Sequence, residues 1–209
     1  MSHRRIAVLV GLLFISSTIT FSVGSGLLKA YFSSPSPDGA DLLVGVLLEV
    51  YTGLAVAAIG VALRPVLTPF GARLATGYLG LRLAECTAIV AFGAYFLMSH
   101  NNFRDYDLIV YTLAAAGGLA LCTLLLRSGL TPRWLSLAGL AGYAILLLGV
   151  VVDLLGITDL DSDAGFAFFI PGGLFELAFP LLLIIKGFTP PPVENARSHV
   201  GSAGRAPQR

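Results

Sequence analysis

Arg82 and Glu85 are two ionisable residues inside an otherwise apolar run of the sequence, residues 77–90. Residues three positions apart lie on the same face of a helix, so the two side chains are placed to form an ion pair. Tyr78 and Ile89 continue the same stripe at helical spacing. Charged side chains within a membrane are costly and usually face the interior of a helix bundle. If this run crosses a membrane, the pair can exchange a proton or bind a polar ligand.

Two more carboxyl groups occur at a similar depth in other apolar runs of the sequence. With a helical rise of about 1.5 Å per residue, each of the four groups lies about 12 to 18 Å from one end of its run. We predict that the second, third and sixth apolar runs bring these four side chains into one proton or ligand site: Glu49, Arg82, Glu85 and Glu176. Because three carboxyl groups would share one guanidinium, we expect at least one glutamate to be protonated near neutral pH.

Four further residues are expected to support this site: Tyr51, Thr52, Tyr78 and Pro180. Proline has no N–H, so Pro180 leaves the carbonyl of Glu176 without its usual helical donor. The alternative is a purely structural clamp, in which Arg82 pairs with one of the glutamates and only fixes the packing of the helices. The sequence does not separate these two interpretations.

The composition of the chain is that of a membrane protein. Of its 209 residues, 56% are hydrophobic and only 12% are charged, against roughly 25% charged residues in soluble domains. Runs of about 20 apolar residues are long enough to cross the hydrocarbon core. We predict an all-α polytopic membrane bundle in one domain, residues 1–188, with six transmembrane helices near residues 6–28, 41–63, 72–97, 106–127, 133–155 and 166–188. Residues 189–209 are rich in Pro, Ser, Gly and charge, so a disordered tail is expected there.

The positions of the basic residues predict the orientation. One set of predicted connections and ends carries most of them: Arg4, Arg5, Arg64, Arg73, Arg127, Arg133, Lys186, Arg197, Arg205 and Arg209. The other set carries only Lys29 and Arg104, together with most of the aspartates. Basic loops stay in the cytoplasm, so both termini are predicted to be cytoplasmic, in a protein of the cell (cytoplasmic) membrane.

The first apolar run also has the general layout of a signal peptide. Arg4 and Arg5 precede an apolar core, and the small residues of 23–25 follow it. The apolar run continues through Leu28, beyond the usual length of such a core, so we expect the span to be retained. Cleavage would leave five spans with the same loop orientation.

The pattern Leu-Arg-x-x-Leu-Thr-Pro occurs twice, at residues 63–69 and 126–132. In each copy, a threonine N-cap followed by proline at the first helical position is expected to start the next span. The second and third spans would then be related to the fourth and fifth as parallel hairpins. The alternative is that two short turns have converged on the same capping residues.

No metal site or cofactor is predicted. Asp159, Asp161 and Asp163 alternate in the last outer loop, but Gly165 is one place late for an EF-hand and Ile170 stands where its final glutamate would be. The loop is therefore interpreted as an acidic outer loop.

Several aromatic and histidine residues lie near the ends of the predicted spans. Trp134 and Tyr106 are predicted to be anchors at the membrane interface. His100 lies at the end of a span, and the other histidines are close to the termini, so a haem held by two intramembrane histidines is not expected.

Three elements of the sequence together resemble a known family: Arg82-x-x-Glu85, residues 127–140, and residues 171–188. They are similar to the bacterial membrane family called domain of unknown function 4386, and the resemblance covers nearly all of the chain up to Phe188. It implies a six-helix protein of the bacterial inner membrane with no established activity.

The leading hypothesis from the sequence is a small proton-linked transporter or a ligand-binding membrane protein. Glu176 or Glu85 would carry the exchangeable proton, with Arg82 as the counter-charge. The expected partners are the lipid bilayer and a small-molecule ligand or proton, and no nucleic acid. The alternative is a structural or regulatory membrane subunit. An enzyme is less favoured, because no phosphate-binding loop, zinc-protease signature or nucleophile elbow is present.

Overall fold

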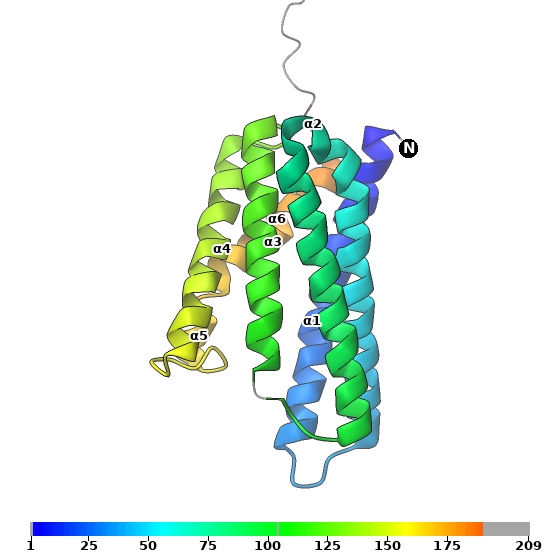
Figure 1. Cartoon of the computed structure of the whole chain (residues 1–209), viewed down its shortest axis with the longest axis vertical. Coiled ribbons are helices and arrows are strands. Elements are labelled where there is room, and N and C mark those ends of the chain that lie inside the picture. Colours follow the sequence, from blue (N-terminus) through cyan, green and yellow to red (C-terminus); the bar gives the residue numbers. More distant parts are fainter. Residues whose placement is uncertain (1, 104, 190–209) are drawn as a thin grey trace, which may run out of the picture.

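The computed structural model describes residues 2–103 and 105–189. Arg104 and the predicted tail from residue 190 onward lie outside the described residues. Within these ranges the structure contains helices, turns and loops but no strand, which confirms the all-α prediction. The helices are α1 (His3–Ser33), α2 (Gly39–Ser99), α3 (Tyr106–Ser128), α4 (Arg133–Leu154), α5 (Asp163–Phe166) and α6 (Ile170–Ile185) (Figure 1).

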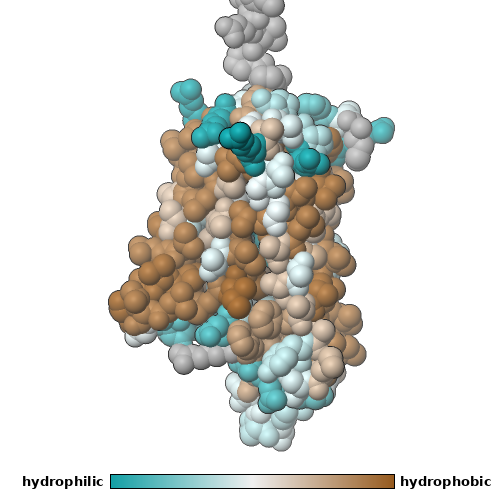
Figure 2. Space-filling model, in the orientation of Figure 1, coloured by the Kyte–Doolittle hydropathy of each residue, from teal (hydrophilic) through white to brown (hydrophobic). Residues whose placement is uncertain are grey.

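Four of these helices, α1 to α4, are long and apolar enough to cross a membrane. Large hydrophobic side chains point outward from them, including Leu12, Leu47, Leu54 and Leu148. In Figure 2 a broad hydrophobic band covers the middle of the visible face, and hydrophilic residues gather toward its two ends. The chain is therefore a multi-pass membrane protein. The last predicted span, residues 166–188, is a shorter apolar helix, because α6 has only 16 residues and follows the single turn of α5.

Helix α2 is a hairpin of two antiparallel halves rather than one straight rod. The backbone leaves helical geometry at Gly71, with φ 161° and ψ 82°. A methyl group added at Gly53 would lie 3.3 Å from the Cα of Cys86, and one added at Gly60 would lie 3.1 Å from the Cβ of Arg82. The first half, residues 39–70, therefore packs closely along the second half, residues 72–99.

The threonines of the repeated Leu-Arg-x-x-Leu-Thr-Pro pattern do not cap helices, so that prediction was wrong. The hydroxyl of Thr131 lies 2.9 Å from the hydroxyl of Ser136, and the residue at the N-cap of α4 is Pro132. The hydroxyl of Thr68 donates to the carbonyl of Arg64 at 2.6 Å, inside α2. Each hydroxyl has found a local partner other than the free amides of a helix start.

The helices form a closed ring around the interior. Helix α1 packs on α2, α2 on α3, α3 on α4, α4 on α6, and α6 on α1 again. Helix α6 crosses the ring obliquely in Figure 1. At the last contact the guanidinium of Arg4 donates to the carbonyls of Leu183 and Ile184 at 3.1 and 2.6 Å. A positive charge at a helix C-terminus is favourable, so the start of the chain stabilises the end of α6.

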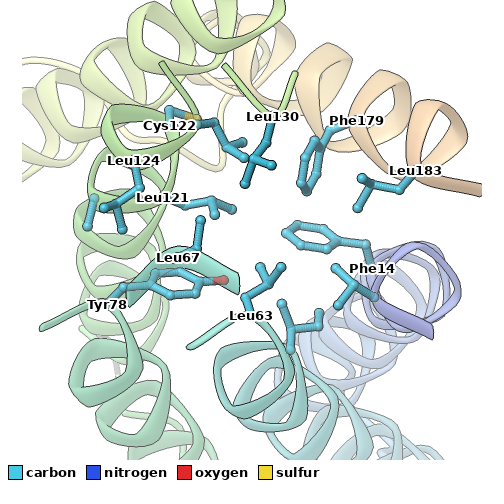
Figure 3. Close-up of a cluster of buried hydrophobic side chains, with 14 of the residues drawn as sticks. Phe14, Leu63, Leu67, Tyr78, Leu121, Cys122, Leu124, Leu130, Phe179 and Leu183 are labelled. Atoms are coloured by element: carbon cyan, nitrogen blue, oxygen red, sulfur yellow. The ribbon is translucent and has the colours of Figure 1, made fainter. Parts of the chain in front are cut away.

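A cluster of apolar side chains fills the ring toward the end where the N-terminus lies. The rings of Phe14 and Phe179 meet edge to face, with their centroids 5.4 Å apart, between α1 and α6. Leu63 and Leu183 lie beside them, and Leu67 belongs to the same cluster (Figure 3). This apolar cluster closes the interior at that end.

Glycine makes the contact between α3 and α4 possible. A methyl group added at Gly118 would lie 2.3 Å from ring atoms of Tyr143, whereas one added at Gly80 would meet nothing within 4 Å. We expect Gly118→Ala to lower the free energy of unfolding by about 1 to 3 kcal/mol, because the buried tyrosine ring must move. Gly80→Ala is the matched control and should keep or slightly raise stability, by up to about 1 kcal/mol. Thermal unfolding of both variants in mild detergent measures the difference. Equal losses would contradict the described packing.

Candidate functional site

Arg82 and Glu85 form a buried ion pair on the second half of α2. The Nη1 atom of Arg82 donates to Oε2 of Glu85 at 2.6 Å, and each residue is 4% exposed. The guanidinium carbon also lies 5.4 Å from the ring centroid of Tyr78, within the range of a cation–π contact. Both charged partners are on the same helix, so their ion pair does not join two helices.

The guanidinium of Arg82 lies against Gly117 of the neighbouring helix, where an added methyl group would make ordinary van der Waals contact. A methyl group added at Gly117 of α3 would lie 3.4 Å from Nε and 3.5 Å from Cζ of Arg82. The buried Nε atom has no hydrogen-bond partner among the described residues. The arginine is thus held by one carboxylate and one aromatic ring, with part of its donor capacity unused.

Glu176 lies on α6 and is bonded to a tyrosine of the neighbouring helix. The hydroxyl of Tyr143 on α4 donates to Oε1 of Glu176 at 3.0 Å. The ring of Tyr143 is fixed against Gly118 and packs edge to face on Phe175. Glu176 itself is only partly buried.

Glu49 lies in a different environment. Its Oε2 accepts a hydrogen bond from the hydroxyl of Tyr106, and its Oε1 has no partner among the described residues. Glu49 is 3% exposed and Tyr106 is 4% exposed. The prediction that Tyr106 is an interface anchor was therefore wrong, because its side chain is buried and joins α3 to α2.

A cavity of about 540 Å³ occupies the interior of the ring. All six helices contribute to its wall, and three of the predicted site residues line it together: Arg82, Glu85 and Glu176. Thr52, predicted as a supporting residue, also lines it. Glu49, Tyr51, Tyr78 and Pro180 are not among its lining residues.

The cavity reaches from these charged groups to the end of the bundle that holds α5. Its wall there includes the exposed residues Ser22, Asp161 and Asp163. At this mouth the ammonium group of Lys29 lies 2.5 Å from Asp161 and 3.5 Å from Asp107. These ion pairs tie α1 to α3 and to the loop before α5.

The supporting residues predicted from the sequence have separate roles. Thr52 lies 2.8 Å, oxygen to oxygen, from Thr20 of α1. Tyr51 is 42% exposed, and its hydroxyl donates to Ser16 at 2.9 Å. Both side chains therefore bind α1 rather than a charged residue.

The other two supporting residues are buried in packing contacts. Tyr78 is fully buried, and its hydroxyl has no hydrogen-bond partner among the described residues. Pro180 packs against α1, where a methyl group added at Gly11 would lie 2.9 Å from its carbonyl oxygen.

Sequence reasoning missed Tyr143, the hydroxyl partner of Glu176. It also missed the adjacent glycines of α3: the side chain of Arg82 lies against Gly117, and that of Tyr143 lies against Gly118. A signal was present, because a tyrosine stands in the middle of an apolar span and two consecutive glycines interrupt another. Their significance depends on which helices are neighbours, and the sequence does not state this.

Comparison with known proteins gave one match. No curated protein and no solved structure matches the chain. Residues 94–187 match the model of the family described as "Domain of unknown function (DUF4386)". The matched range contains α3 to α6, with Tyr143 and Glu176, while Arg82 and Glu85 precede it. Residues 94–187 of the chain are therefore similar to the domain of unknown function 4386, the family that the sequence resembles, and the match does not extend to residues 1–93.

Proposed function

We propose that this protein crosses the bacterial cytoplasmic membrane six times, with both ends inside, and binds a small ligand in exchange for a proton. The observation that carries the proposal is the interior cavity, because Arg82 and Glu85 of α2 and Glu176 of α6 all line it. Concave sites with mainly apolar walls and a few polar groups are typical of small-molecule binding.

The six spans are α1, the two halves of α2, α3, α4 and α6. Their connections alternate between the two ends of the bundle in Figure 1, with the bend of α2 at the end where the N-terminus lies. Basic residues flank that end of the predicted spans: Arg5, Arg64, Arg73, Arg127 and Arg133. This distribution supports a cytoplasmic location for that end. Helix α6 is short, so we assign the rest of the sixth membrane crossing to α5 and the turns that precede α6.

Glu176 is the group that we assign to proton exchange. Glu85 already has a positively charged partner, the guanidinium of Arg82. Glu176 has a neutral partner, the hydroxyl of Tyr143, and remains partly exposed. A carboxyl group that faces a cavity without a fixed counter-charge is free to take up and release a proton.

The alternative interpretation, a structural subunit whose charged residues only fix the packing of the helices, fits Glu49 better than it fits the other three residues of the predicted cluster. The bond between Glu49 and Tyr106 joins two helices in a buried position away from the cavity, as a clamp does. The ion pair of Arg82 lies within one helix and provides no such link. We therefore assign Glu49 to packing and the other three residues to the ligand site.

The orientation of the chain can be tested with single cysteines. Cys86 and Cys122 are first replaced by alanine. In this background, Ser36→Cys places a thiol in the connection between α1 and α2, and Ser2→Cys places one at the N-terminus. We expect a membrane-impermeant maleimide added to intact cells to label Ser36→Cys only. After the cells are opened, both variants should react. Labelling of Ser2→Cys in intact cells would contradict the proposed orientation.

Water access to the cavity is tested in the same background. Ala114 lines the cavity, whereas Leu47 points outward and lies equally far along its helix. We expect a small polar thiol reagent to modify Ala114→Cys from outside, because a thiol in water ionises and reacts. Leu47→Cys, which faces lipid, should stay unmodified. If Ala114→Cys resists the reagent from both sides of the membrane, the proposed ligand cavity is wrong.

A further inference from the structure

The charges and aromatic rings of the cavity point to the chemical class of its ligand. We propose that it binds a lipophilic organic cation, whose positive charge pairs with the carboxylate of Glu176 in place of a proton. This inference rests on the proposed function, because it names the ligand of the same cavity.

The cavity wall carries side chains of both charges, and they do not balance. Two cationic and four carboxyl side chains line it: Lys29, Arg82, Glu85, Asp161, Asp163 and Glu176. Lys29 is paired with Asp161 at 2.5 Å and Arg82 with Glu85 at 2.6 Å. Among the described residues, Asp163 and Glu176 have no cationic partner within ion-pair distance. The wall therefore has an excess of negative charge.

The two unpaired carboxyl groups lie at different depths, and this difference determines where a cation would bind. Asp163 is exposed, in the first turn of α5 at the mouth. Glu176 is half-buried inside the ring and is oriented by Tyr143. A cation that entered past Asp163 would find its strongest unpaired partner at Glu176, where less water screens the attraction.

The cavity wall is also rich in aromatic side chains. Six aromatic side chains line the cavity: Phe14, Phe21, Tyr111, Tyr143, Phe166 and Phe169. Aromatic faces attract organic cations, more strongly where water is excluded. A small inorganic cation would need several oxygen ligands, and the described residues contain no cluster of three or more His, Cys, Asp or Glu side chains able to hold a metal ion. A bulky apolar cation fits these walls better.

Protons should compete with this ligand. The ionisable groups around Glu176 are Tyr143 on α4, Arg82 and Glu85 on α2, and Cys122 on α3. Helix α1 faces this part of the cavity with Phe14, Ser17 and Thr18, and none of these carries a charge. Protonation of Glu176 removes the unpaired negative charge, so binding of a cation should weaken as the pH falls.

The test uses two probes of the same shape and opposite charge. Tetraphenylphosphonium and tetraphenylborate are each equilibrated by dialysis against the purified full chain in detergent, with protein-free micelles as the blank. We expect saturable binding of tetraphenylphosphonium only, weaker at mildly acidic than at mildly alkaline pH. Preference for tetraphenylborate, or no binding of either probe, overturns the inference.

Two matched variants locate the binding site. Glu176→Gln keeps an acceptor for Tyr143 but removes the charge, so we expect tetraphenylphosphonium affinity to fall about tenfold or more, with loss of the pH dependence. Glu49→Gln makes the same change in the other tyrosine-bonded glutamate, outside the cavity, and should bind as the wild type does. Equal affinity of the two variants overturns the inference. If Glu176→Gln does not fold, the two-probe comparison on the wild type decides.

The outcome also separates this inference from the proposed function. If Ala114→Cys reacts from outside but tetraphenylphosphonium does not bind, the ligand class is wrong and the hydrated cavity stands. If Ala114→Cys resists the reagent, the inference fails together with the proposed function.

Discussion

The buried ion pair between Arg82 and Glu85 is the constraint on which the rest of the structure depends. Charge within the hydrocarbon region is costly, so the pair must be surrounded by protein or water rather than lipid. The second half of α2 turns both side chains inward, where Gly60 on the first half leaves space for the arginine and Gly117 of α3 lies against its guanidinium. The ring of helices thus encloses the charges, and its interior is too polar at this level to close as a purely apolar core.

The two tyrosine–glutamate bonds lie in different surroundings inside the ring. Glu49 and Tyr106 are both almost fully buried, and one oxygen of Glu49 has no partner. Glu176 and Tyr143 line the cavity with Arg82 and Glu85. The apolar contact between Phe14 and Phe179 closes the end beyond them (Figure 3). The same chemical pair therefore has a packing role in one place and a proposed ligand-binding role in the other.

The sequence predicted how far along its helix each charged residue lies better than it predicted which residues of other helices it contacts. Spacing alone placed Arg82 beside Glu85, and composition predicted an all-helical membrane protein. Helical rise predicted a similar depth for Glu49 and Glu176, but it does not give the rotation of a helix or the identity of its neighbours. Those features determine that Glu49 meets Tyr106 while Glu176 meets Tyr143. Only the packed ring supplies that information.

The central claim, that Glu176 faces a hydrated cavity while Glu49 is dry, is tested most directly by removing each tyrosine hydroxyl. Thermal unfolding of Tyr106→Phe and Tyr143→Phe should be compared in the same detergent. The account predicts that Tyr106→Phe loses about 1 to 3 kcal/mol of stability, because a buried carboxyl group loses its hydrogen bond. Tyr143→Phe should lose much less, since water can replace the missing donor at Glu176. Equal losses would show that Glu176 is as dry as Glu49 and would contradict the account.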